Sequence, residues 1–168
     1  LMAEMSMVPP QMLGGVWRKS ERLIDKLQRV SHGRFENQDI LHELFSGKQQ
    51  FWAVWDGEVE ELPIIGVVIT EIMAYPRKRI LCIQYCAGDR LNEWMSDILE
   101  LLEKWAKTCD CDGLELTGRR GWVRTLQPEG WKEEYVVVSK SFDEPEITVA
   151  FDRPQLELIE GLEVANGR

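Results

Sequence analysis

Residues 113–142 read GLELTGRRGWVRTLQPEGWKEEYVVVSKSF, and this stretch decides the predicted fold. Residues 114–117 are typical of a short strand. Residues 118–126 are typical of a short helix, because proline and glycine follow at once and end it. After a Gly130-Trp131 step, the β-branched residues of 135–139 predict the last strong strand.

The residues before this stretch add helices and strands in a definite order. Apolar side chains at helical spacing predict one helix over 17–30 and a second that begins at residue 37 or 38 and ends at 45. The almost unbroken apolar run IIGVVI at 64–69 is typical of a strand buried on both faces. We predict strands over 50–55, 63–73 and 80–86, and the longest helix from residue 89 to about 107.

Composition limits the possible functions. The chain has 168 residues, of which 44% are hydrophobic and 29% charged, as expected for one globular domain. A net charge of −9 argues against a nucleic-acid partner, because phosphate binding needs a basic face. No apolar run approaches the ~20 residues of a membrane span. The first residues lack the pattern of a signal peptide, so we expect neither secretion nor a membrane partner.

The two ends differ from the middle. Residues 143–168 hold seven acidic and two basic residues, a net charge of −5. The first segment is rich in methionine and contains Pro9-Pro10. We therefore predict an N-terminal arm over 1–14, a folded domain over 15–142 and an acidic C-terminal tail over 143–168.

Cysteine and histidine make a metal site or a hydrolase improbable. The four cysteines do not have zinc-finger spacing, and the two histidines lie far from them in the sequence. No GxSxG motif accompanies the histidines. We expect no metal and reduced, partly buried thiols. The cysteines are Cys82, Cys86, Cys109 and Cys111.

The order of elements over 17–142 resembles the Gcn5-related N-acetyltransferase fold, with Gly130-Trp131 where that family usually has Gly-Phe. The resemblance implies an α/β domain in which helices cover both faces of a mixed, mostly antiparallel sheet. It also implies acetyl-coenzyme A as cofactor. The phrases GVVITEI…YP and LELLEKWA…DGLELTGRRGWVR further resemble small proteins of the morphogenesis gene clusters of tailed bacteriophages.

The coenzyme loop departs from the family's pattern. Members hold the pyrophosphate of coenzyme A at a helix N-terminus, in a loop of the form Q/R-x-x-G-x-G/A. Here Ala87 stands at the first glycine position and Asp89 at the second. We expect Asp89 to cap the helix and repel phosphate, with Arg90 compensating in part. Acetyl-coenzyme A binding is therefore expected to be negligible, and no cofactor is expected. Candidate coenzyme-binding residues are Gln84, Ala87, Gly88 and Arg90.

Catalytic residues are equally hard to assign. Members of the family often use a tyrosine on the short penultimate helix as the general acid of the reaction. In this chain Trp122 lies on that helix instead. Glu71 is either a base for the acceptor amine or an ordinary exposed strand residue. Cys86 can line the same groove. We therefore assign no catalytic residue, with Glu71 and Cys86 as the candidates that remain.

Other residues indicate contacts with partners. Trp122 lies among three arginines, and tryptophan and arginine are typical interface anchors. Trp131 suits an interface or the core equally. Alternating apolar residues of the tail can add a strand to a sheet edge. We expect both chain ends to pack against other subunits or a different virion protein. The interface candidates are Arg119, Arg120, Trp122, Arg124, Trp131, Ile147, Val149 and Phe151.

These observations predict a non-catalytic structural or assembly protein of a tailed phage, which uses the acetyltransferase-like fold as an interaction platform. Its expected partners are other virion proteins or copies of itself, in an oligomer. Its expected location is the virion or the host cytoplasm. The alternative is an active acyl-coenzyme A-dependent N-acetyltransferase.

Overall fold

The computed structural model describes residues 1–142, and the chain divides into two units, 1–132 and 133–168. The first unit contains a five-stranded sheet in the order β1-β2-β3-β4-β5. The first four strands pair antiparallel, and β5 pairs parallel to β4, as the resemblance implied. The strands are β1 (Ala3–Val8), β2 (Gln49–Asp56), β3 (Ile64–Ala74), β4 (Arg79–Gly88) and β5 (Gly113–Leu116).

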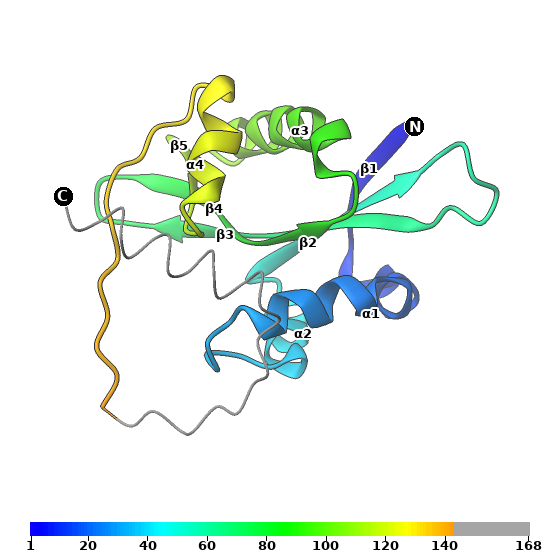
Figure 1. Cartoon of the computed structure of the whole chain (residues 1–168), viewed down its shortest axis with the longest axis horizontal. Coiled ribbons are helices and arrows are strands. Elements are labelled where there is room, and N and C mark those ends of the chain that lie inside the picture. Colours follow the sequence, from blue (N-terminus) through cyan, green and yellow to red (C-terminus); the bar gives the residue numbers. More distant parts are fainter. Residues whose placement is uncertain (143–168) are drawn as a thin grey trace. The chain divides into compact units, whose positions relative to one another are not determined.

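Helices cover both faces of the sheet, which confirms the predicted architecture. Figure 1 shows α1 and α2 on one side of the sheet and α3 and α4 on the other. The three longer helices each bury apolar residues that recur at helical spacing, whereas the shortest, of six residues, buries only Leu126. The helices are α1 (Leu13–Arg29), α2 (Asn37–Phe45), α3 (Met95–Thr108) and α4 (Gly121–Leu126).

The sheet separates two hydrophobic cores, and β3 supplies both. Val68 packs with Ile98 on the α3 side, whereas Ile69 packs with Leu23 on the α1 side. Successive side chains of a strand point to opposite faces, so the unbroken apolar run predicted this double burial. The run thus places β3, and β4 beside it, at the centre of the sheet.

The N-terminal segment corrects the expectation of a separate arm over 1–14. Residues Ala3–Val8 form β1, which pairs with β2 along six residues from Ala3↔Asp56 to Val8↔Phe51. Leu13 is fully buried as the first residue of α1. The arm was expected because methionine and proline set this segment apart in composition. Its alternation of half-buried and exposed residues is that of an edge strand.

The predicted strand over 135–139 is absent from the described part of the second unit. Residues 133–142 contain no strand, and their apolar side chains are exposed, reaching 90% for Val138 and 91% for Phe142. β-branched residues favour a strand only where a neighbouring strand supplies hydrogen bonds and packing. The tail over 143–168, with Ile147, Val149 and Phe151, lies outside the described residues.

None of the helices within residues 1–142 is long and apolar enough to cross a membrane.

Candidate functional site

The loop between β4 and α3 is the predicted coenzyme site, but its backbone differs from the prediction. A 3-10 turn covers Leu91–Glu93, and α3 begins only at Met95 rather than at residue 89. Arg90 interrupts the expected helix, because its φ of 54° and ψ of 39° are left-handed. Three candidate residues, Gln84, Ala87 and Gly88, therefore lie within β4, away from the first turn of α3.

Asp89 contacts α1 and does not cap α3. Its carboxylate forms ion pairs with Arg22 and with Lys26, whose Nζ lies 3.3 Å from Oδ1. Its backbone N–H donates to the carbonyl of Ile65 at 2.8 Å. Burial raises the pKa of Asp89, but hydrogen bonds from Arg22 and Lys26 outweigh this and leave the pKa below its usual value. No side chain caps α3, so the predicted Asp89 cap is wrong.

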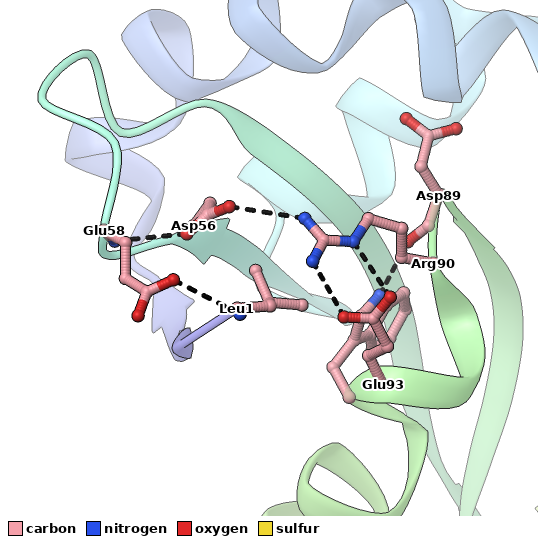
Figure 2. A network of polar contacts seen from close by, with 7 residues as sticks. Leu1, Asp56, Glu58, Asp89, Arg90 and Glu93 are labelled. Carbon is pink, nitrogen blue, oxygen red and sulfur yellow. Dashed lines mark hydrogen bonds and ion pairs between the residues drawn. The ribbon is translucent and has the colours of Figure 1, made fainter.

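Arg90 is already held by two carboxylates of its own chain. Its Nη2 lies 2.8 Å and its Nε 3.0 Å from the Glu93 oxygens, and its Nη1 lies 3.4 Å from Asp56 Oδ2. Figure 2 shows the guanidinium between these two acids, with the Asp89 side chain pointing away from it. The hydrogen bond from Arg90 lowers the pKa of Glu93. The base expected to compensate for Asp89 thus already has partners.

The charges around this loop are already balanced within the chain. Four carboxylates face three basic side chains and the α-amino group of Leu1, which lies 3.2 Å from Glu58. A site for a pyrophosphate needs an excess of positive charge. The acids are Asp56, Glu58, Asp89 and Glu93, and the bases are Arg22, Lys26 and Arg90.

Most contacts of this network join residues that lie far apart in the sequence. Arg90 and Asp56 lie 34 positions apart, and Lys26 and Asp89 lie 63 positions apart. Among these ion pairs, only the one between Arg90 and Glu93 lies within one helical turn in sequence. A spacing rule can find such a local pair, whereas the longer-range partners depend on the sheet that brings their elements together.

Trp94 fills the space that the loop's glycine leaves open. Its side chain is only 1% exposed, and its Nε1–H donates to the Asp89 carbonyl at 2.8 Å. A Cβ at Gly66 would lie 2.5 Å from Trp94 Cζ2, and a Cβ at Gly88 would overlap the same atom. In a coenzyme-binding loop, a glycine such as Gly88 lets a phosphate approach the backbone. In this structure the indole of Trp94 takes that place.

The last part of β4 has no strand partner on its β5 side within the described residues. β4 and β5 pair only from Ile80↔Gly113 to Ile83↔Leu116, and β4 then continues alone on that side as far as Gly88. The register between β3 and β4 shifts here, so that Thr70 faces Ile83 while Ile69 faces Tyr85. Gln84 is the extra residue of this bulge. Within residues 1–132 the β5 side of this part of β4 has no strand partner.

Glu71 is a buried residue, so its interpretation as an ordinary exposed strand residue is wrong. It is 9% exposed and accepts hydrogen bonds from Gln49 Nε2 at 3.1 Å and Gln84 Nε2 at 3.5 Å. Lys48 Nζ lies 3.7 Å from its other oxygen. The structure thus brings together the candidates Glu71 and Gln84, in the middle of the paired region of β3 and β4, beside the bulge.

Cys86 has the electrostatic properties of an inert thiol. It packs against the core on the α3 side, and burial raises the pKa of its thiol to about 12. The thiolate is the nucleophilic form of cysteine. Cys86 therefore has little capacity for nucleophilic chemistry at neutral pH.

This property predicts slow alkylation of Cys86. At pH 8 the native protein is expected to carry roughly a thousandfold less Cys86 thiolate than an ordinary cysteine. Iodoacetamide labelling followed by mass spectrometry of the Cys86 peptide, in native and in urea-unfolded protein, measures the ratio. Equal labelling rates in both states would contradict the burial of this thiol.

The region of α4 contains packed tryptophans beside exposed arginines. Trp122 packs on Gly118, where a Cβ would lie 2.7 Å from Trp122 Cδ1. Trp122 and Trp131 are partly buried against the core on the α3 side. Arg119, Arg120 and Arg124 are exposed. The core thus covers part of the surface of each tryptophan. Whether the rest of that surface contacts a partner protein stays a prediction.

The part of the chain that the structure describes contains no cluster of three histidine, cysteine or acidic side chains able to hold a metal ion. Its four cysteines are unpaired and partly buried.

Comparison with solved structures identifies the fold. The structure resembles glucosamine-6-phosphate N-acetyltransferase from Arabidopsis thaliana, with a TM-score of 0.62 and 14% identity over 85% of this chain and 100% of that one. Ribosomal-protein-alanine N-acetyltransferase from Brucella melitensis biovar Abortus 2308 gives a TM-score of 0.63 and 11% identity, over 83% and 99% of the two chains.

A predicted acetyltransferase from Clostridium acetobutylicum, solved with acetyl-coenzyme A, gives a TM-score of 0.59 and 13% identity over 83% of this chain and 96% of that one. No protein-family model and no curated relative matches the chain. Identities this low establish architecture alone. The chain has the fold of the Gcn5-related N-acetyltransferases, with a β4–α3 loop that its own side chains occupy.

Proposed function

We propose that the protein uses the acetyltransferase fold without its chemistry, as an interaction platform in the assembly of a tailed phage. The observation that carries the proposal is the occupied β4–α3 loop. Arg90 is engaged by Asp56 and Glu93, and Trp94 fills the space over Gly88. The phage setting rests on the resemblance of two sequence phrases to proteins of phage morphogenesis clusters.

The pyrophosphate of coenzyme A does not fit the loop as its side chains stand. Arg90 would have to leave its ion pairs with Asp56 and Glu93 to reach the phosphates, and the Glu93 carboxylate would then stand beside them unpaired. Like charges at this range oppose binding. A second deficit supports the proposal, because the chain's tyrosines, Tyr75, Tyr85 and Tyr135, all lie outside α4.

The proposed platform acts through exposed arginines and the chain ends. Arg119, Arg120 and Arg124 are exposed beside Trp122, and tryptophan with arginine is the usual composition of an interface hot spot. The proposed partners are other virion proteins or further copies of this chain.

The alternative function is acyl-coenzyme A-dependent N-acyl transfer. The residues of β4 from Gln84 to Gly88 support this alternative, because they do not pair with β5. Their backbone groups could form hydrogen bonds with the amide groups of an extended ligand. The N-terminus of α3, which no side chain caps, also favours an anion. Binding of the coenzyme separates the two functions.

Calorimetric titration of the full chain with acetyl-coenzyme A is expected to give no measurable binding. The physical reason is that the loop has no excess of positive charge and that Arg90 is engaged by Asp56 and Glu93. The Glu93→Gln variant removes one charge and loosens Arg90, so any binding that appears should appear there first. The matched control is Glu103→Gln, which removes the same charge from an exposed pair with Lys107 on α3.

Micromolar binding to the unmodified chain overturns the proposal and favours the acyltransferase. Binding that Glu93→Gln gains and Glu103→Gln does not would show that the loop's own carboxylates exclude the coenzyme.

A further inference from the structure

Two connecting segments of opposite charge lie at opposite ends of the sheet. The loop between β2 and β3, residues 57–63, contains three glutamates, and residues 75–79, which connect β3 to β4, contain three basic residues. We call these segments the acidic loop and the basic turn. Figure 1 shows them at the two ends of β3. The charged residues are Glu58, Glu60 and Glu61 in the acidic loop, and Arg77, Lys78 and Arg79 in the basic turn.

The charges of both segments are available to a partner molecule. All six charged residues are exposed. Glu58 lies 3.2 Å from the α-amino group of Leu1. Four of the others form no ion pair with any residue of 1–142, namely Glu60, Glu61, Arg77 and Lys78. Each segment thus presents two adjacent charges that the described part of the chain does not neutralise.

Backbone hydrogen bonds hold both segments in a definite shape. The Leu62 N–H donates to the Val59 carbonyl at 2.9 Å, and the Tyr75 N–H donates to the Lys78 carbonyl at 2.8 Å. Each segment also exposes apolar surface, since Val59 is 38%, Leu62 46% and Tyr75 49% exposed. A contact between an acidic loop and a basic turn would therefore bury apolar side chains beside its ion pairs, as protein interfaces do.

The length of β3 keeps the acidic loop away from the basic turn of the same chain. β3 has 11 residues, which at roughly 3.3 Å per residue separate the two segments by about 35 Å. Salt screens exposed charges beyond about 8 Å at physiological ionic strength. The acidic loop can therefore meet a basic turn only on another molecule.

We propose that the acidic loop of one copy of this chain binds the basic turn of another copy, with two glutamates facing two bases. A partner of the same sequence supplies the charges that match each segment in sign and number. Because every copy carries one segment of each kind, the contact can form twice in a closed pair or repeat along a row. The inference rests on the proposed platform role, for which it names a partner and a surface, and it requires nothing of the coenzyme loop.

Sedimentation velocity of the full chain over a range of protein and salt concentrations tests the proposal. A faster-sedimenting species is expected at low ionic strength and should decrease as salt is added, because salt screens exposed ion pairs. Association through apolar surface alone would respond in the opposite way, because salt also screens the repulsion between chains of net charge −9. A chain that never associates, or whose association salt strengthens, overturns the proposal.

Charge reversal in each segment makes the test specific. Glu60→Lys with Glu61→Lys, and Arg77→Glu with Lys78→Glu, are each expected to weaken self-association about tenfold or more, because like charges then face one another. An equal mixture of the two variants should associate again. One variant carries two basic segments and the other carries two acidic segments, so the opposite charges meet only between the variants.

Reversals on α3 control for the change in net charge. Glu100→Lys with Glu103→Lys, and Lys104→Glu with Lys107→Glu, change the net charge by the same amounts at exposed ion pairs outside both segments. These controls should associate like the unmodified chain. The proposal fails if they weaken association as much as the reversals in the two segments do, or if the mixture stays dissociated while both variants keep the circular dichroism of the unmodified chain. Titration with acetyl-coenzyme A tests the platform role separately, so failure of one proposal is distinguishable from failure of the other.

Discussion

Replacing Trp94 by alanine is expected to lower the free energy of unfolding by about 3–5 kcal/mol. Trp94 is 1% exposed and is among the largest fully buried side chains of the described chain. Its removal leaves a cavity over Gly66 and Gly88 and leaves the Asp89 carbonyl without its indole donor. Urea unfolding monitored by circular dichroism measures the loss.

A double-mutant cycle tests whether the two glycines exist for this indole. Gly66→Ala alone is expected to cost about 1–3 kcal/mol, because its Cβ would lie 2.5 Å from Trp94 Cζ2. In the Trp94→Ala background the same change should cost much less, because the new methyl group enters the cavity. An equal cost in both backgrounds would show that the glycine serves some other purpose.

Deleting residues 1–8 is expected to have the second-largest effect, a loss on the order of 3 kcal/mol and about 10 °C in melting temperature. β1 pairs with β2 along six residues, and its half-buried residues Ala3, Met5 and Met7 pack against the core. Thermal unfolding of the shortened and the full chain, with size-exclusion chromatography of both, measures stability and association together.

An unchanged melting temperature after this deletion would contradict the prediction. If the shortened chain melts at the same temperature but changes its state of association, residues 1–8 serve an interface and not the chain's own sheet. A chain that melts earlier and keeps its state of association supports the edge strand.

Local patterns were sufficient to predict most elements of the fold. The apolar spacing predicted the end of α2 and its start to within one residue, and it predicted the centres of α1, β2, β3 and β4. This success has a physical basis, because helix and strand periods of 3.6 and 2 residues sort side chains onto faces within a few positions. β1 was missed although AEMSMV alternates apolar and polar residues, because the methionine and proline content of 1–14 indicated a separate arm. The strand over 135–139 was overpredicted because β-propensity requires a partner.

The same distinction between local pattern and long-range contact applies to the candidate site. The sequence by itself determined the departure from the family's loop pattern, since Ala87 and Asp89 are visible in the chain, and it determined the absence of a tyrosine from α4. Only the tertiary structure decided that Asp89 pairs with α1, that Arg90 joins Asp56, and that Trp94 packs over Gly88. Hydrogen-bond and ion-pair energies fall off within a few ångströms. Which distant residues come within that range depends on the register of the sheet and the packing of the helices, and sequence spacing does not encode either.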